Sequence, residues 1–468
     1  MFLRLLARGP VKFECVWLCL ENTDKTDKME QCTEEQREPI RAVLDGKSIF
    51  LTGPGGTGKS FLLAALYKEY KATGRQIAVT ALTGCAAILL GPYAKTLHSW
   101  AGIGLGKGPV DTLVKDIQYN KYKKKNWIDT DCLVIDEVSM LTPQLLETLD
   151  EIGRRVRRRP TESFGGIQVV FVGDFFQLPP VSKDGILQYA FQSPIWYKIV
   201  QRSFQLKTIH RQSEAEFHTI LQEARNGTLS PESYAKLEAR KNEAWKGQII
   251  RPTLLFTRNN DVKQINVSNL AKLKRDTVVF TAKTIAPPSC PKDDVAYKVQ
   301  KLDKDAPYEV ELELKVGAQV MLLTNMDAAE RLVNGSRGVV KGFAEDGYPL
   351  VQFKTSPHPV RIVPHTWESD EDSKCVVKRE QIPLRLAYAL TIHKAQGASL
   401  DSALVDIGRA TFEYGQAYVA LSRVRSLGAL YVYDIDPSAF RVHPAVKQFY
   451  EELGTRDWIE EAPLSFID

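Results

Sequence analysis

Eight residues early in the chain have the types and spacing needed to hold a triphosphate. Glycines allow backbone dihedrals that turn successive N–H groups toward phosphate oxygens, and a lysine and a hydroxyl complete such a loop. Lys59 is expected to reach the β- and γ-phosphates, and Ser60 to offer its hydroxyl to Mg²⁺. The pattern predicts nucleotide binding, and the residues that would cradle the phosphates are Gly53, Pro54, Gly55, Gly56, Thr57, Gly58, Lys59 and Ser60.

Two carboxylates and one amide follow later apolar runs and could complete this site. Asp136 is expected to hold Mg²⁺ through water, and Glu137 to orient and deprotonate an attacking water, which favours hydrolysis over binding alone. Gln177 follows the next buried run and, by parallel topology, should lie beside the γ-phosphate, where it could sense hydrolysis. An Asp-Glu pair at a strand end is otherwise an ordinary exposed turn.

The elements that must position these residues alternate between strand and helix. The phosphate loop joins a strand expected over 48–52 to a helix over 61–70, which is the order that such a loop requires. Repeated apolar runs with helices between them indicate an α/β fold with a doubly wound parallel sheet. The runs of this first core are 48–52, 76–81, 132–135 and 167–172. A second α/β core is expected from the runs 203–207, 253–257, 384–391, 403–407 and 430–433.

The order of these runs divides the chain into domains. Residues 281–382 carry short alternating β segments and turn signals, which predicts a small β-barrel inserted into the second core, with an exposed acidic loop over 368–373. The expected domains are an N-terminal extension 1–28, a first core 29–200, a second core 201–280 with 383–440, the insertion 281–382 and a C-terminal tail 441–468.

Composition describes an ordinary multi-domain globular chain. Its 468 residues are 44% hydrophobic and 25% charged, and the net charge of +5 is too small to demonstrate a polyanionic partner. No run reaches the roughly 18 apolar residues of a membrane span, so no membrane partner is expected. The seven cysteines form no C-x-x-C pair and lack histidine partners at zinc spacing, so neither a disulfide framework nor a zinc site is expected.

Two basic clusters, at 121–125 and 154–159, could contact phosphates or could be solvated faces. The first contains interleaved aromatic residues. A third basic pattern lies in residues 1–12, where Arg4, Arg8 and Lys12 stand among apolar residues and resemble a mitochondrial presequence. A disordered tail and an over-extended start ahead of Met29 remain open. The expected localisation is accordingly the nucleus or the mitochondrion.

A fixed order of motifs resembles one helicase family over about residues 30–436. The motifs are Gln36, 53–60, 79–87, 96–104, 135–140, 164–168 with 173–180, 210–212, 391–397 and 416–423. Their wording is similar to that of the petite integration frequency (PIF) helicases, in the RecD-like, 5′ to 3′ branch of helicase superfamily 1. The resemblance implies ATP as the nucleotide, two RecA-like P-loop NTPase cores and an SH3-like insertion.

The resemblance also implies roles for single residues at the nucleotide. Arg211 and Arg423 match two arginines that the second core extends to the γ-phosphate, where a guanidinium stabilises transition-state charge. They join Lys59, Glu137 and Gln177 as the expected catalytic residues. Gln36 could contact the adenine edge or could only serve a helix N-terminus capped by Thr33. The remaining nucleotide contacts expected from the motifs are Gln396 and Gly397.

A DNA path is implied across both cores. Small hydroxyls, amides and cations suit phosphates rather than base edges, so no sequence specificity is expected. Residues 103–126 match an insertion that places a wedge beside the duplex. The residues expected at DNA are Thr83, Gly84, His98, Ser99, Lys123, Lys124, Lys125, Thr391, His393 and Lys394.

The sequence therefore predicts a Mg²⁺-dependent ATPase that moves along single-stranded DNA and unwinds duplexes. Within the family this implies forked DNA, and also G-quadruplexes or RNA–DNA hybrids, as partners. A monomer in solution with a DNA-induced dimer is expected. Two alternatives stay open at this point: a translocase that does not unwind, and a nucleic-acid-binding protein that uses ATP only as a conformational ligand.

Overall fold

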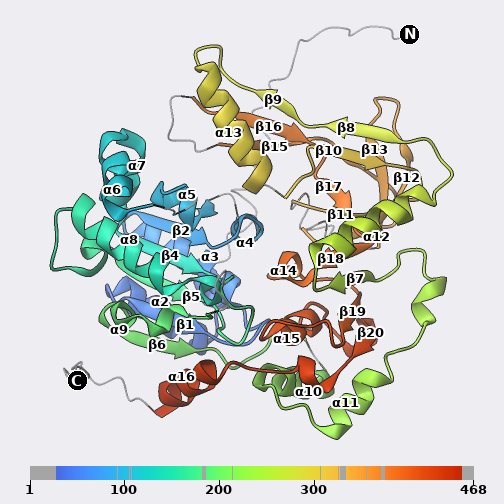
Figure 1. The fold of residues 1–468 in the computed structure, drawn as a ribbon, viewed down its shortest axis with the longest axis horizontal. Coiled ribbons are helices and arrows are strands. Elements are labelled where there is room, and N and C mark those ends of the chain that lie inside the picture. Colours follow the sequence, from blue (N-terminus) through green and yellow to red (C-terminus); the bar gives the residue numbers. More distant parts are fainter. Residues whose placement is uncertain are drawn as a thin grey trace, which may run out of the picture.

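The structure is a computed structural model, and it describes residues 28–455 except 92, 105, 107, 182–185, 213, 306, 325, 327–331, 333, 355 and 370–374. The expectations for residues 1–27 and for most of the acidic loop at 368–373 lie outside the described residues. Figure 1 shows two α/β cores, with a β-rich domain next to the second of them.

A six-stranded parallel sheet in the order β3-β2-β4-β5-β1-β6 forms the first core. Its strands are β1 (Ile49–Thr52), β2 (Ile77–Ala81), β3 (Ala94–Thr96), β4 (Cys132–Asp136), β5 (Gln168–Val172) and β6 (Arg202–Gln205). All four runs predicted for this core are strands. β6 corrects the expectation that 203–207 opens the second core, because it pairs with β1 at the edge of the first sheet. A short run carries no signal for the sheet that accepts it.

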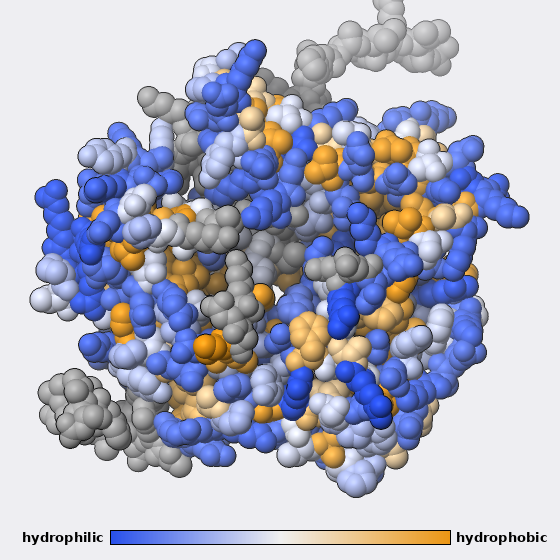
Figure 2. All heavy atoms as spheres, viewed as in Figure 1, coloured by the Kyte–Doolittle hydropathy of each residue, from blue (hydrophilic) through white to orange (hydrophobic). Residues whose placement is uncertain are grey.

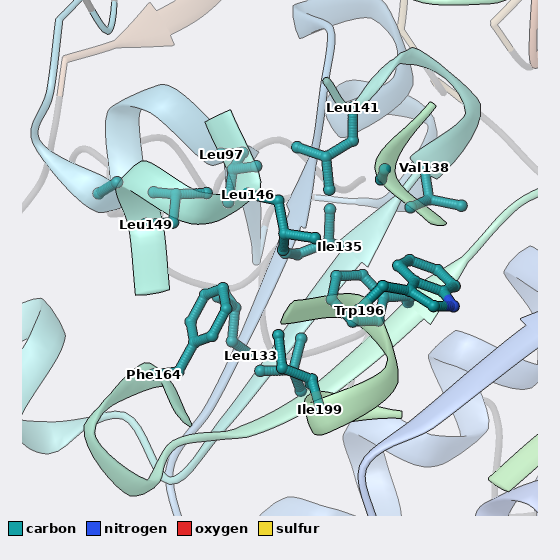
Figure 3. Packing of buried hydrophobic residues seen from close by; sticks show 14 of the residues in the cluster. Leu97, Leu133, Ile135, Val138, Leu141, Leu146, Leu149, Phe164, Trp196 and Ile199 are labelled. Atoms are coloured by element: carbon teal, nitrogen blue, oxygen red, sulfur yellow. The ribbon is translucent and has the colours of Figure 1, made fainter. Parts of the chain in front are cut away.

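Helices cover both faces of this sheet. On β4, Leu133 belongs to one buried cluster and Val134 to another, as expected where successive side chains point to opposite faces. Figure 3 shows the first cluster, which also contains Leu146 and Trp196 from neighbouring helices. The helices are α1 (Lys28–Gln31), α2 (Glu34–Leu44), α3 (Lys59–Ala72), α4 (Gly84–Leu90), α5 (Leu97–Ala101), α6 (Val110–Tyr119), α7 (Lys121–Asp129), α8 (Pro143–Val156) and α9 (Pro194–Ile199).

A four-stranded parallel sheet in the order β18-β7-β19-β20 forms the second core. Its strands are β7 (Thr253–Phe256), β18 (Ala389–Thr391), β19 (Ala403–Ile407) and β20 (Leu430–Ile435). The accompanying helices are α10 (Ala215–Asn226), α11 (Pro231–Glu238), α12 (Asn259–Ala271), α14 (Ile392–Ala395) and α15 (Gln416–Leu421).

The run predicted as one core strand over 384–391 is divided between two sheets. β17 (Leu384–Leu386) pairs with β11 of the inserted domain, and only β18 belongs to the core. The chain changes sheets between them, because the Ala387 N–H donates to the Gln319 carbonyl while the Tyr388 carbonyl accepts from Leu254. A continuous apolar run therefore concealed a domain boundary.

The inserted domain holds three antiparallel sheets, so the predicted barrel is not confirmed. Their orders are β14-β13-β12-β11-β17, β15-β16-β9 and β10-β8. The helix is α13 (Lys292–Asp305), and the remaining strands are β8 (Val278–Thr281), β9 (Lys283–Ile285), β10 (Glu311–Leu314), β11 (Gln319–Leu322), β12 (Arg337–Phe343), β13 (Pro349–Phe353), β14 (Val360–Arg361), β15 (His365–Glu368) and β16 (Lys378–Gln381). The domain thus extends a few residues beyond the expected 281–382 at both ends.

One disulfide qualifies the expectation that the cysteines form no disulfide framework. Cys290 and Cys375 are bonded across 85 residues and join the segment before α13 to the segment before β16. The sequence argument considered only short spacings, and two cysteines this far apart give no such signal. Cys32 and Cys132 are free and buried in the first core.

The C-terminal segment is a helix rather than a simple tail. α16 (Pro444–Thr455) follows the last strand of the second core, but Val446 and Phe449 belong to a buried cluster of the first core. Figure 1 shows this red helix beside the green β6. The expectation for 441–468 is therefore corrected for 444–455, because α16 carries an apolar face that the first core buries, and 456–468 lie outside the described residues.

The molecular surface is largely polar on the face shown in Figure 2, where hydrophobic residues gather only in small patches. Within the described ranges no helix has the length and apolar character needed to cross a membrane.

Candidate functional site at the junction of the two cores

The phosphate loop lies between the end of β1 and the start of α3. Gly58 caps α3 with φ 84°, and a Cβ there would lie 2.6 Å from Gln36 Nε2, so glycine is required. Lys59 Nζ donates to the carbonyls of Gly53 (2.6 Å) and Pro54 (3.0 Å). Burial lowers the pKa of Lys59, and the nearby carboxylate of Asp174 opposes this effect. The loop therefore has the geometry that its sequence predicts.

A cavity of about 470 Å³ opens over this loop between the two cores. The first core contributes the phosphate loop, both carboxylates and the predicted sensor, whereas the second core contributes residues from two of its motifs. The lining residues are Gly55, Gly56, Gly58, Lys59, Ser60, Phe61, Asp136, Glu137, Gln177, His210, Arg211, Gly397, Ser399, Arg423 and Arg425. Residues from positions 55 to 425 thus meet in one place.

The residues beside the loop fit a divalent cation next to a triphosphate. Asp136 is buried, and burial together with the charge of Glu137 raises its pKa to about 7. A buried carboxylate beside a second one is favoured by a bound cation, and Ser60 lines the same cavity. Among the described residues no group of three His, Cys, Asp or Glu could hold a metal. This fits Mg²⁺, which usually takes one carboxylate, waters and substrate phosphates.

Three polar side chains from both cores meet beside these carboxylates. The Gln396 amide of the second core donates to Glu137 Oε2 (2.9 Å) and to Gln177 Oε1 (3.4 Å). Glu137 has φ 56°, a left-handed conformation that is uncommon outside glycine and that orients its side chain at the end of β4. The predicted water-activating residue and the predicted sensor are therefore held by one amide from the opposite core.

The two predicted arginines line the cavity in different ways. Arg211 has one contact, from NH1 to the Ser422 carbonyl (3.3 Å), and its Cβ passes so close to Gly56 that a side chain there would clash. Arg423 is buried, and its guanidinium donates to the carbonyls of Val419, Ala395 and Ala398 and to the Ser422 hydroxyl. Burial and the charge of Arg211 lower the pKa of Arg423 to about 9, so both remain cationic at neutral pH.

The other predicted nucleotide contacts shape the loop without lining the cavity. Gln36 is buried, and its Nε2 donates to the Thr57 carbonyl (3.4 Å). Its Oε1 accepts from the Thr33 N–H (3.2 Å), which completes a capping box at the start of α2. Both alternatives considered for Gln36 are thus represented structurally, and its adenine contact stays a prediction. Gly53, Pro54 and Thr57 form the base of the loop.

The residues predicted at DNA lie at helix N-termini on both sides of the junction. Thr83 caps the start of α4, and Thr391 caps α14, where its hydroxyl accepts from Lys394 N–H. Gly397 approaches Leu89 of α4, so these two helices lie together. Ser99 of α5 accepts from Lys301 of the inserted domain (3.4 Å). The predicted residues Gly84, His98 and His393 belong to α4, α5 and α14.

The predicted wedge contains two helices, α6 and α7. Lys124 and Lys125 of α7 are exposed, whereas the aliphatic stem of Lys123 packs against Gly102 and is only partly accessible. The lysine cluster is therefore not a uniform cationic patch.

The second basic cluster, at 154–159, makes contacts within the first core. Arg154 pairs with Asp150, and Arg155 pairs with Asp111 and Glu151. Arg157 donates to the carbonyls that end α7. These contacts give the cluster a role in joining α6, α7 and α8, so the solvated-face alternative does not describe it fully.

Comparisons with known proteins identify the family. Residues 31–234 match the family model described as PIF1-like helicase, and residues 300–343 match the model described as DNA helicase Pif1, 2B domain. The chain is 39% identical to the human ATP-dependent DNA helicase PIF1, over 90% of this chain and 64% of that protein. It is 35% identical to the Xenopus laevis protein of the same name, over 94% of this chain and 67% of that protein.

The chain belongs to the PIF1-like helicase family. It resembles the crystal structure of Pif1 helicase from Candida albicans with a TM-score of 0.75 and 37% identity, covering 90% of this chain and 99% of that one. Pif1 from Bacteroides in complex with ADP-AlF4 gives a TM-score of 0.74 at 28% identity, covering 91% and 98%. The predicted family and the two RecA-like cores are confirmed. This chain spans about 64% of the length of the human and zebrafish relatives.

Four cavity residues of this PIF1-like chain received no role from the sequence. Phe61, His210, Ser399 and Arg425 all line the cavity. His210 and Ser399 adjoin predicted motifs, and Arg425 follows Arg423 by two positions, so proximity to a motif was the available signal. It was insufficient, because position along a loop does not indicate which way a side chain points.

Proposed function

We propose that this chain is a Mg²⁺-dependent, DNA-stimulated ATPase that moves 5′ to 3′ along single-stranded DNA and unwinds duplexes. The observation that carries the proposal is the single cavity in which Lys59, Asp136 and Glu137 of one core face Arg211 and Arg423. The human relative is named an ATP-dependent DNA helicase, and Bacteroides Pif1 has been crystallised with ADP-AlF4 and with single-stranded DNA.

The first core binds and activates in this proposal. Lys59 exchanges its two carbonyl contacts for phosphate oxygens, and Ser60 and Asp136 hold Mg²⁺, which neutralises charge on the phosphates when bound. Glu137 orients the attacking water and accepts its proton. The amide of Gln396 fixes the carboxylate of Glu137 from the opposite core.

The second core stabilises the transition state. Arg211 and Arg423 supply positive charge that a planar guanidinium directs at phosphate oxygens. Because these arginines and Gln396 come from the second core, hydrolysis depends on how closely that core approaches the loop. A cycle of binding, hydrolysis and release would then open and close the junction once per ATP.

DNA is proposed to lie across the same junction. Thr83 and Ser99 belong to first-core elements, and Thr391 and Lys394 to α14 of the second core. Contacts to phosphates on both cores would convert closure into movement along the strand. A published complex describes two coordinating Pif1 helicases unwinding forked duplex DNA, so forked DNA and a DNA-induced dimer are proposed here too. RNA–DNA hybrids and G-quadruplexes are further proposed substrates.

Strand separation on tailed substrates tests the proposal. Duplexes with only a 5′ tail, only a 3′ tail, or a fork are incubated with ATP and Mg²⁺, and Lys59→Ala serves as the inactive control. Separation of the 5′-tailed and forked duplexes, and not of the 3′-tailed one, is expected. Separation from the 3′ tail alone would contradict it. ATP hydrolysis and DNA movement without strand separation would identify the translocase alternative, and DNA binding without hydrolysis the binding protein.

The cellular role is proposed as replication, repair, recombination, or telomere or mitochondrial genome maintenance, in the nucleus or the mitochondrion. Sequencing the N-terminus of the protein from purified organelles tests this assignment. A mitochondrial pool that begins after residue 12 supports import with cleavage, and absence of the protein from both organelles contradicts the assignment.

A further inference from the structure

A buried ion pair joins the two cores beneath the nucleotide cavity. Asp174 follows β5 of the first core, and Arg225 lies in the last turn of α10 of the second. The guanidinium donates from Nε to Asp174 Oδ2 (3.0 Å) and from NH2 to Asp174 Oδ1 (2.9 Å). The side chains are 0% and 4% exposed, so water does not screen the pair.

The hydroxyl of Tyr450, from α16, binds the same carboxylate. It donates to Asp174 Oδ1 (3.3 Å) and accepts from the Phe175 N–H (3.2 Å). It also lies 2.5 Å from Thr52 Oγ1, at the last residue of β1. Burial raises the pKa of Tyr450, so the hydroxyl stays protonated and can donate. One side chain therefore ties the ends of β1 and β5 together.

Both strand ends lead directly to the catalytic groups. Thr52 precedes the phosphate loop, and Gln177 stands three residues after Asp174. The turn between them is fixed by Asp174, whose side chain accepts from the Phe176 N–H (3.2 Å) and whose carbonyl accepts from the Gln177 N–H (2.9 Å). The guanidinium of Arg225 lies 4.1 Å from the centre of the Phe176 ring. A movement of α10 is therefore transmitted to the turn that holds the sensor.

Stability alone gives a weak reason for this arrangement. Burial by itself would lower the pKa of Arg225, but the charge and hydrogen bonds of Asp174 raise it, so the pair is ionised. A buried ion pair often stabilises a fold no better than apolar side chains of similar volume. What the pair provides is a fixed geometry, because a guanidinium that makes two hydrogen bonds to one carboxylate tolerates little displacement.

We propose that Arg225 is a positioning residue that couples the approach of the second core to the placement of Gln177, with Tyr450 keeping the phosphate loop in register with the same turn. The inference rests on the proposed ATP hydrolysis. Arg225 and Tyr450 touch no phosphate in this scheme; they act through Asp174 and the turn at 174–177.

Variants with matched controls test the proposal. Arg225→Gln removes the bidentate contact, Arg225→Lys keeps the charge, and Tyr450→Phe removes only a hydroxyl. Arg240→Gln and Tyr431→Phe are the controls, because both residues are bonded within the second core and its flanking segments. The measurements are the kcat and KM of DNA-stimulated ATP hydrolysis, the Kd of a fluorescent ATP analogue, and the ATP consumed per duplex separated.

The expected result is a loss in kcat with binding retained. Arg225→Gln should lower kcat by about 100-fold, the loss that a displacement of about 1 Å causes, while Kd stays within about threefold. Arg225→Lys should recover part of kcat, and Tyr450→Phe should raise the ATP consumed per duplex. Both controls should match the wild type. Unchanged kcat and unchanged ATP consumption in Arg225→Gln and Tyr450→Phe would overturn the proposal.

Two further arms keep the outcome interpretable. If Arg225→Gln fails to fold, the double variant Asp174→Asn with Arg225→Gln leaves no unpaired buried charge, and the same loss of kcat is expected in it; a wild-type kcat there overturns the proposal. If the wild type itself hydrolyses no ATP with DNA present, the proposed function is overturned, and the coupling inference with it. Loss of coupling in the variants alone is distinguishable from that result.

Discussion

Arg211 and Arg423 illustrate how two residues with one expected role can differ in their surroundings. Arg211 makes a single contact with the Ser422 carbonyl, whereas Arg423 satisfies three buried carbonyls and a hydroxyl. A buried carbonyl that loses its donor costs about 1–3 kcal/mol. The two arginines are therefore expected to behave alike in catalysis and differently in stability.

Alanine substitution of each arginine tests this difference. Arg211→Ala should lower kcat by about 10³-fold, as when an arginine finger is removed, with nucleotide affinity and Tm nearly unchanged. Arg423→Ala should lower kcat and also Tm. Hydrolysis, equilibrium nucleotide binding and thermal unfolding are measured on the same preparations. An Arg211→Ala enzyme with the wild-type turnover would remove that residue from the mechanism.

Predictability at this scale depends on whether partners are close in sequence. Lys59 and Ser60 could be placed because the loop that positions them is contiguous. The contacts from Asp174 to Arg225 and to Tyr450 span 51 and 276 residues, and no spacing rule connects such positions. Gln396 could be assigned to the nucleotide site from its motif, but its bond to Glu137 required the structure.

At the scale of elements, the end of α8 holds α7 in place. Arg157 donates to the carbonyls of Trp127 (2.6 Å), Ile128 (3.1 Å) and Thr130 (3.0 Å), and also to that of Gly165 (2.7 Å). Burial lowers its pKa. The carbonyls at a helix C-terminus lack partners within the helix, so an arginine from a neighbouring helix can satisfy them. The sequence showed the cluster of arginines but not the carbonyls that they face.

Removing this connection is expected to destabilise the first core. Arg157→Ala should lower the free energy of unfolding by about 1–3 kcal/mol, because carbonyls lose their donor. Arg159→Ala is the control, since Arg159 forms an exposed ion pair with Glu162 and should cost less than about 1 kcal/mol. Urea denaturation of both variants measures the difference. Equal losses would show that the carbonyl contacts do not carry the effect.

The lysines of α7 differ in accessibility, which sharpens the expected DNA contact. Replacing Lys124 and Lys125 with glutamine should reduce the slope of log K against log salt concentration by about 1, because up to two phosphate contacts are lost. Lys123→Gln should have a smaller effect, since its stem packs on Gly102. The control replaces the exposed Lys68 and Lys71 of α3. An unaltered slope for Lys124 and Lys125 would identify a solvated face.

The boundaries between elements were predicted less well than the elements themselves. β6 and the division of 384–391 were assigned to the wrong sheet, because apolar character indicates burial and not the identity of the neighbour. The same holds for α16, which follows the second core in sequence and packs in the first. These contacts depend on the return of a chain across a domain junction, which local patterns do not encode.

At the scale of the whole molecule, the two cores share one catalytic site and are connected by several side chains. Tyr418 of α15 accepts a hydrogen bond from the Gly55 N–H (2.8 Å), Gln396 reaches Glu137, and Arg225 pairs with Asp174. Each of these contacts can respond to a nucleotide, and none lies within a single domain. We therefore expect hydrolysis to depend on closure of the junction, which DNA bound across both cores would favour.

The rate of ATP hydrolysis with and without single-stranded DNA, at saturating ATP and Mg²⁺, tests this account most directly. The account predicts slow hydrolysis by the protein alone, strong stimulation by DNA, and loss of the stimulated rate in Lys59→Ala and Arg211→Ala. A rate that is the same with and without DNA, or a stimulated rate that survives in Arg211→Ala, would contradict a catalytic site completed by the approach of the second core.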